Sequence, residues 1–150
     1  GKIFIKDIIQ KPPLAVILPY TKENEIYLEA QYRDAFGKTI LEVAAGHVDP
    51  DEDPLEAAKR ELQEETGLIA RQWREVARWE ASPNLNEQIH IFFVTDLTEG
   101  KQQVEDDEEI KLVKIPLEEA IKKIETGEIS VGFHVAVLLL FEKLMKEGKL

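Results

Sequence analysis

The sequence contains no cysteine, so neither a disulfide bond nor thiolate chemistry can contribute to its stability or its function. Long apolar runs are also missing. The longest, residues 135–141, falls well short of the roughly 20 residues that a membrane-spanning helix needs. The first residues show no signal-peptide pattern. We therefore expect a cytoplasmic protein without a membrane partner.

Basic residues are scarce beside acidic ones: 19 lysines and arginines stand against 30 aspartates and glutamates, a formal net charge of −11. No stretch gathers the basic residues into a stripe, which excludes a nucleic acid as the main partner. An acidic protein can still bind a phosphorylated small molecule when metal ions neutralise the local charge. With 43% hydrophobic and 33% charged residues, the chain suits one soluble domain, residues 1–150.

The order of apolar and polar residues predicts an α+β fold. Alternation and short apolar runs favour strands at residues 2–7, 14–18, 26–33, 40–43, 72–80, 88–94 and 110–113. Helical periodicity favours helices at residues 54–66, 116–126 and 131–146, the last capped by Ser130. Several strands with three helices indicate an α/β/α sandwich with a mixed sheet.

Residues 46–68 carry the strongest local signals in the chain. Asp53 stands where an N-cap belongs, Pro54 takes the first helical position, and Glu56 is placed to close a capping box. Gly67 supplies the C-terminal stop. These signals predict a helix of about three and a half turns between them.

Three glutamates gather on one edge of this predicted helix. Glu61 is a helix neighbour of both Glu64 and Glu65, so the three carboxylates repel one another and require compensation. A hard divalent cation is the natural compensator, because Mg²⁺ prefers carboxylate oxygens and bridges to substrate phosphates. The alternative is a solvated acidic helix without a ligand.

The same stretch resembles the Nudix box, G-x5-E-x7-R-E-U-x-E-E-x-G-U, in which U is a bulky aliphatic residue. Every specified position is filled at the required spacing, by Gly46, Glu52, Arg60, Glu61, Leu62, Glu64, Glu65, Gly67 and Leu68. The resemblance implies the Nudix fold, in which a mixed sheet lies between helices. It also implies a hydrolase that depends on Mg²⁺ or Mn²⁺.

The resemblance assigns roles to the residues of the box. It implies metal ligands at Glu61, Glu64 and Glu65, joined by the backbone carbonyl of Ala45. The resemblance also implies catalytic roles for Glu64 and Arg60. Arg60, like Glu52, is expected to orient the glutamates rather than to touch substrate.

Beyond the box, the chain resembles the ADP-ribose pyrophosphatase branch of the Nudix hydrolases, through Gln31-Tyr32-Arg33, Leu41-Glu42 and Ser82-Pro83. This implies substrate-binding roles for Arg33, Glu42 and Pro83. Arg33 could bind a phosphate through a bidentate fork, or could be an ordinary surface arginine of its strand. The sequence departs from the branch at Ala44, where proline is common, and at Asn84, where glycine is common.

The acidic segment 105–109 resembles the loop that supplies the base in that branch. Counting back from Ile110 puts Glu108 at the metal-binding place and Asp106 at the base place, with Glu105 as a rival base. The three histidines, His47, His90 and His134, are scattered, and we predict a catalytic role for none of them.

The function that the resemblance implies is hydrolysis of the pyrophosphate bond of a nucleoside diphosphate-linked small molecule, with ADP-ribose cleaved to AMP and ribose 5-phosphate. Two alternatives stay open. One is a nucleotide-sugar or dinucleoside polyphosphate pyrophosphatase, and the other is a non-catalytic ligand sensor of Nudix type. The resemblance also allows a homodimer.

Overall fold

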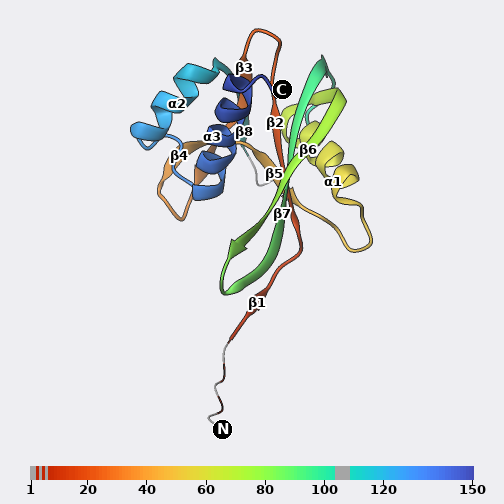
Figure 1. The fold of residues 1–150 in the computed structure, drawn as a ribbon, viewed down its shortest axis with the longest axis vertical. Coiled ribbons are helices and arrows are strands. Elements are labelled where there is room, and N and C mark those ends of the chain that lie inside the picture. The colour runs from red at the N-terminus through yellow and green to blue at the C-terminus, as the bar shows by residue number, and fades with distance from the viewer. Residues whose placement is uncertain (1–2, 4, 6, 104–108) are drawn as a thin grey trace.

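The computed structural model describes residues 3, 5, 7–103 and 109–150 of the chain. Its elements, in chain order, are β1 (Ile9–Gln10), β2 (Leu14–Pro19), β3 (Glu25–Arg33), β4 (Lys38–Glu42), β5 (Ala44–His47), α1 (Pro54–Thr66), β6 (Leu68–Ser82), β7 (Leu85–Glu99), β8 (Ile110–Pro116), α2 (Leu117–Glu125) and α3 (Gly132–Lys146). A mixed sheet joins β1, β7, β2 and β5, with β6 paired to β7, and a second, antiparallel sheet has the order β4-β3-β8. Figure 1 shows α1 on one side of β2 and β5, and α2 with α3 on the other. The predicted α+β sandwich with a mixed sheet is confirmed.

Strand β2 is buried along its whole length and divides the interior into two cores. Val16 and Leu18 face the larger core, which α2 and α3 cover, whereas Ala15 and Ile17 face the smaller core under α1. This alternation follows from the period of two in a strand. A strand covered by helices on both faces reads as a continuous apolar run, as residues 14–18 do.

Helix α1 begins and ends where the local signals predict. The Asp53 carboxylate accepts a hydrogen bond from the Leu55 amide at 2.9 Å, and Gly67 ends the helix in the left-handed region at φ 70°. The predicted capping box does not form, because the Glu56 carboxylate pairs with Lys59 at 2.7 Å. A lysine three residues on is within easy reach of an exposed glutamate, and its charge outcompetes the amide of the cap.

Helices α2 and α3 follow the predicted ranges to within a residue, but the predicted cap at Ser130 is wrong. The N-cap of α3 is Val131, and no side chain caps this helix. Broad apolar burial holds α3 in place instead. The ring of Phe141 makes edge contacts with those of Tyr20 and Phe93, at centroid distances of 4.9 and 5.1 Å.

Strands β6 and β7 form a long hairpin that extends beyond the predicted ranges 72–80 and 88–94. Register shifts between Glu75 and Ala77 and between Glu80 and Ser82 interrupt the alternation of apolar residues. A bulge inserts an extra residue and so breaks the period from which a strand is recognised. In Figure 1 the turn of this hairpin points away from the helices.

The strand predicted at residues 2–7 is not found in the part of this range that the structure describes. Of its residues, the structure describes Ile3, Ile5 and Asp7, and none of them belongs to a strand. Ile3 and Ile5 are 92% and 91% exposed, so their alternation with charged residues does not reflect a buried face. Among the described residues at this end, strand pairing is confined to Ile9 and Gln10 of β1, which runs parallel to β7. Within the described residues, no helix is long and apolar enough to span a membrane.

Candidate active site

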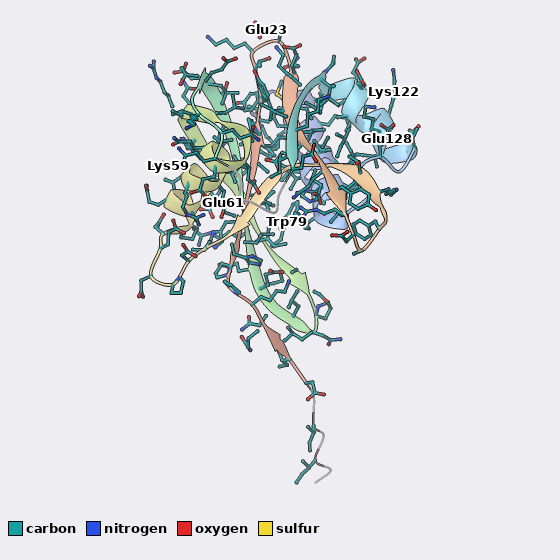
Figure 2. The ribbon with its side chains drawn as sticks, turned by 180° about the vertical axis from the view of Figure 1, so that it is seen from behind. Glu23, Lys59, Glu61, Trp79, Lys122 and Glu128 are labelled. Carbon is teal, nitrogen blue, oxygen red and sulfur yellow. The ribbon has the colours of Figure 1, made fainter. Side chains whose placement is uncertain are left out.

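Helix α1 places two of the predicted metal ligands against strand β5. The Glu61 carboxylate lies directly on Gly46, so closely that a Cβ at this glycine would overlap it. The Glu65 carboxylate accepts a hydrogen bond from the Ala45 amide at 3.1 Å. In Figure 2, Glu61 is on the side of α1 that faces β5, and Lys59 is on the outer side. The structure thus brings Ala45, Gly46, Glu61 and Glu65 together.

Arg60 lies at the centre of the carboxylates of the box. Its guanidinium contacts Glu61 at 2.7 Å, Glu52 at 2.9 Å and Glu64 at 3.3 Å, and it donates to the backbone carbonyl of His47 at 3.2 Å. These contacts raise the pKa of Arg60, with the hydrogen bond to Glu52 as the largest cause. The guanidinium therefore compensates the mutual repulsion of the glutamates and fixes their positions. That Arg60 and Glu52 act by orientation stays a prediction, and these contacts are the arrangement that it requires.

The glutamates of α1 form a donor set suited to a hard divalent cation, although the cluster is not closed. Burial raises the pKa of Glu61, and the Arg60 guanidinium only partly offsets this. Once it is ionised, a buried carboxylate is stabilised by a cation beside it. Among the described residues, no three acidic or histidine side chains converge closely enough to enclose an ion. Arg60 holds Glu61 and Glu64 where a cation would compete for them.

A pocket of about 680 Å³ opens beside this cluster. Ala45 and Glu65 lie on its wall together with two of the predicted substrate-binding residues, Arg33 and Glu42. Arg33 Nε donates to Glu42 Oε2 at 2.7 Å, and the Glu42 side chain is only 5% exposed. Hydrogen bonds from His134 and Arg33 lower the pKa of Glu42 despite the opposing effect of burial, which is the largest single influence. Glu42 is therefore an anion that holds the arginine at the pocket wall.

Pro83 lies apart from these residues. It belongs to the turn of the β6–β7 hairpin and lines another pocket, of about 590 Å³, together with Ile8, Gln10 and Leu85. None of the other predicted site residues that the structure describes lines that pocket. A substrate-binding role for Pro83 stays a prediction, because within a single copy of the chain Pro83 lies apart from the other described site residues.

Glu105, Asp106 and Glu108 lie outside the described residues, but both flanks of their segment are anchored beside the box. The Gln103 amide donates to the Glu64 carbonyl at 2.9 Å. The side-chain amide of Gln102 bridges the carbonyls of Glu65 and Ile110. The described residues Gln102, Gln103 and Ile110 are therefore held near the C-terminal turn of α1, where Glu64 and Glu65 are.

Sequence reasoning missed several pocket residues: Glu29, Gln31, His47, Phe133 and His134. The first two had a readable signal. Glu29 and Gln31 alternate with apolar residues on β3, yet both are buried, so this strand carries polar side chains on a covered face. His134 gave no such signal, since its partners are 91 and 92 residues away in the chain.

Known proteins resemble this chain in sequence and in fold. Residues 11–132 match the model of the NUDIX domain. The chain is 32% identical to the ADP-ribose pyrophosphatase of Bacillus subtilis (strain 168), in an alignment that covers 98% of this chain and 83% of that protein. It is also 32% identical to the methanol dehydrogenase activator of Bacillus methanolicus, covering 86% of this chain and 71% of that one. A solved structure, described as the crystal structure of an ADP compounds hydrolase, superposes with a TM-score of 0.78 at 23% identity, covering 93% of this chain and 78% of that chain.

The match spans more than the box. It runs from the residue after β1 to the first residue of α3, and so includes the smaller core, much of the larger core, α1 and most of the pocket wall. The nine fixed positions of the box lie within it, with the Glu61 carboxylate on Gly46 and Arg60 among the glutamates. This chain belongs to the Nudix hydrolase family.

Proposed function

We propose that this protein hydrolyses the pyrophosphate bond of ADP-ribose, giving AMP and ribose 5-phosphate, with the help of Mg²⁺ or Mn²⁺. One observation carries the proposal: Glu65, which lies on the Ala45 amide, lines the same pocket as Arg33. A pyrophosphate needs both a cation site and a fixed positive charge, and here they share one wall. The similarity to an ADP-ribose pyrophosphatase over nearly the whole chain supports this substrate over other nucleoside diphosphate derivatives.

The cation would be held by Glu61, Glu64, Glu65 and the backbone carbonyl of Ala45, with Glu108 added from the acidic segment. When bound, it supplies neutralisation of the pyrophosphate oxygens and a water of lowered pKa. The side chains of the protein itself bind the phosphate, position the glutamates and take up the proton.

In the proposed mechanism, Arg33 binds a phosphate group through the terminal nitrogens of its guanidinium. Arg60 and Glu52 keep Glu61 and Glu64 in place. Asp106 or Glu105 takes the proton from the attacking water. The flanks of the acidic segment support this assignment, because Gln102 and Gln103 are hydrogen-bonded to the backbone of Glu65 and Glu64.

The test is hydrolysis of a panel of nucleoside diphosphate derivatives with Mg²⁺: ADP-ribose, ADP-glucose, GDP-mannose and diadenosine tetraphosphate. We expect ADP-ribose to give the highest kcat/KM. Glu65→Gln keeps an acceptor for the Ala45 amide but removes the charge, and should lower kcat on the order of 100-fold or more. Glu56→Gln is the matched control, because Glu56 is an exposed glutamate of the same helix whose side chain, among the described residues, pairs with Lys59 alone.

Other outcomes separate the alternatives. A higher kcat/KM for GDP-mannose or the dinucleotide would replace ADP-ribose as substrate and leave the reaction type intact. Binding of ADP-ribose by calorimetry without turnover of any panel member would favour the ligand sensor.

The cellular location and the homodimer stay proposals too. We propose a cytoplasmic homodimer, and the exposed isoleucines of the N-terminal arm, Ile8 and Ile9 at 61% and 62%, are surface that a second copy could cover. Sedimentation velocity of the full chain tests the oligomeric state.

A further inference from the structure

A buried histidine on the pocket wall has no part in the mechanism above. His134 belongs to the first turn of α3, lines the same pocket as Arg33 and Glu42, and has a side chain only 4% exposed. The ring of Phe133 lies against it, with centroids 4.0 Å apart. A buried imidazole needs partners for both ring nitrogens, and these partners indicate what it does.

The two partners fix the protonation of the ring. The Val43 amide lies 3.1 Å from Nδ1, and because a backbone N–H can only donate, Nδ1 carries no proton. The remaining proton is on Nε2, which lies 3.3 Å from Glu42 Oε1 and donates to it. Burial also lowers the pKa of His134, which favours the neutral ring. The imidazole is thus a fixed connection from the backbone of residue 43 to one oxygen of Glu42.

The other carboxylate oxygen of Glu42 accepts a hydrogen bond from Arg33 Nε at 2.7 Å. Within the described part of the chain, this is the one side-chain contact of the Arg33 guanidinium, and the side chain is 43% exposed. Its two terminal nitrogens stay available to a ligand. A guanidinium held at Nε presents them as a planar fork, the geometry that binds phosphate oxygens.

We propose that His134 is a positioning residue: through Glu42 it holds the Arg33 guanidinium at the angle that binds a phosphate group of the substrate. The inference rests on the proposed function, in which Arg33 is a phosphate ligand. Without the histidine, Glu42 keeps its charge but can rotate about its side-chain bonds, and the fork of Arg33 turns with it.

Three substitutions separate this role from packing. His134→Gln keeps an acceptor for Val43 and a donor long enough to reach Glu42. His134→Asn keeps the Val43 contact but falls short of Glu42, and His134→Leu keeps the bulk and loses both contacts. We expect KM for ADP-ribose to rise by roughly tenfold or more in the Leu and Asn variants, the usual effect of losing a charge-assisted contact. The Gln variant should stay within about threefold of wild type, and kcat should change less than KM in all three.

A double-mutant cycle tests the path through Arg33. If His134 acts through this arginine, His134→Leu adds nothing to the rise in KM that Arg33→Ala already causes. A purely structural role would instead raise KM by the same factor with and without Arg33. That result, or a normal KM in both the Leu and Asn variants, would overturn the proposal. Should the Leu variant fail to fold by circular dichroism, the Asn variant takes its place, since it keeps the backbone contact.

A second readout needs no substrate, so it separates failure of this inference from failure of the proposed function. The Nε–H proton of Arg33, hydrogen-bonded to Glu42, should exchange slowly with water in an NMR spectrum of the wild type. It should exchange fast in His134→Asn and slowly in His134→Gln. If the wild type hydrolyses no panel member but shows this pattern, the function fails and the positioning stands. If the wild type is active and the exchange of the Arg33 proton is the same in all variants, the positioning fails alone.

Discussion

Glycine is required at position 46 by the carboxylate that lies on it. The backbone of β5 and the side chain of Glu61 approach so closely that no Cβ fits between them. This contact sets a glutamate of α1 against the backbone of β5, and it gives a physical reason for the glycine of the box. A side chain at this position must push the glutamate away rather than weaken the fold at large.

Gly46→Ala should therefore impair the site more than the fold. We expect the displaced Glu61 to lower kcat/KM for ADP-ribose by roughly tenfold or more, while circular dichroism stays unchanged. Gly132→Ala is the matched control, because a Cβ at Gly132 would meet no atom within 4 Å. Activity lost equally in both variants would contradict this account of Gly46.

A second carboxylate, that of Glu75 on β6, stabilises the fold and is not one of the candidate site residues. Arg78 binds it through two nitrogens at 2.7 and 2.8 Å, and His90 Nδ1 lies 2.8 Å from it. The hydrogen bonds from Arg78, with those from His90 after them, lower the pKa of Glu75 from 4.5 to about 2. Because the folded-state pKa is the lower one, its stabilisation is complete above about pH 4.5 and is lost as the pH falls toward about 2.

Glu75→Gln should thus destabilise the protein at neutral pH and not in strong acid. Since the side chain is 30% exposed, we expect a loss of only about 1 kcal/mol in the free energy of unfolding at neutral pH. The difference from wild type should shrink as the pH falls below about 4.5. Urea unfolding across this range measures it, with the exposed Glu80→Gln of the same strand as control. A difference that is constant with pH would contradict the prediction.

At the scale of elements, α1 shows which signals can be read from a sequence. Its bounds were predicted from Asp53, Pro54 and Gly67, because capping and left-handed termination involve only residues close in the chain. The hairpin β6–β7 was predicted too short, since its bulges break the period of two. Of the strand predicted at residues 2–7, the described residues Ile3, Ile5 and Asp7 lie in no strand, because alternation alone cannot create a partner.

The candidate site divides in the same way. Glu61, Glu64 and Glu65 could be grouped from their spacing on one helix, and Arg60 with them. The series of hydrogen bonds from Val43 through His134 and Glu42 to Arg33 could not be predicted, because it joins α3 to β4 across most of the sequence. Contacts of such separation depend on the tertiary fold, which local patterns do not contain.

The cap of α1 can be tested by itself. Asp53→Ala removes the acceptor of the Leu55 amide and should lower the free energy of unfolding by about 1 kcal/mol. Glu56→Ala should lower it by less than about 0.5 kcal/mol, since Glu56 contributes an exposed ion pair and no capping bond. Urea unfolding of both variants is the measurement. Equal losses would show that the capping box forms in solution.

At the scale of the whole molecule, charge is the dominant feature. A net charge of −11 means that the folded chain repels itself, and Glu61, Glu64 and Glu65 add local repulsion where they gather beside a single arginine. A cation bound there relieves this repulsion only in the folded state, because the cluster does not exist in the unfolded chain. Binding must then stabilise the fold.

Mg²⁺ should accordingly raise the Tm of the protein, by an amount that corresponds to about 2.7 kcal/mol at a hundred times the Kd. NaCl at equal ionic strength controls for screening and should give a smaller shift. Glu65→Gln should lose most of the shift due to Mg²⁺, and Glu56→Gln should keep it. Equal shifts with both salts would show that Mg²⁺ acts only by screening.

The sign of the pH dependence follows from Glu61. Burial raises its pKa in the metal-free fold, so its neutral form stabilises that fold at low pH, and this contribution is lost as the pH rises through the raised pKa. A cation requires the ionised carboxylate, so protons and Mg²⁺ compete for this residue. The shift in Tm due to Mg²⁺ should therefore be largest at neutral pH and decline toward the range near 4.5 where glutamates titrate. A Glu61→Gln variant should show a small shift at every pH, because it has no proton to lose. A shift in the wild type that grows on acidification would place the cation elsewhere.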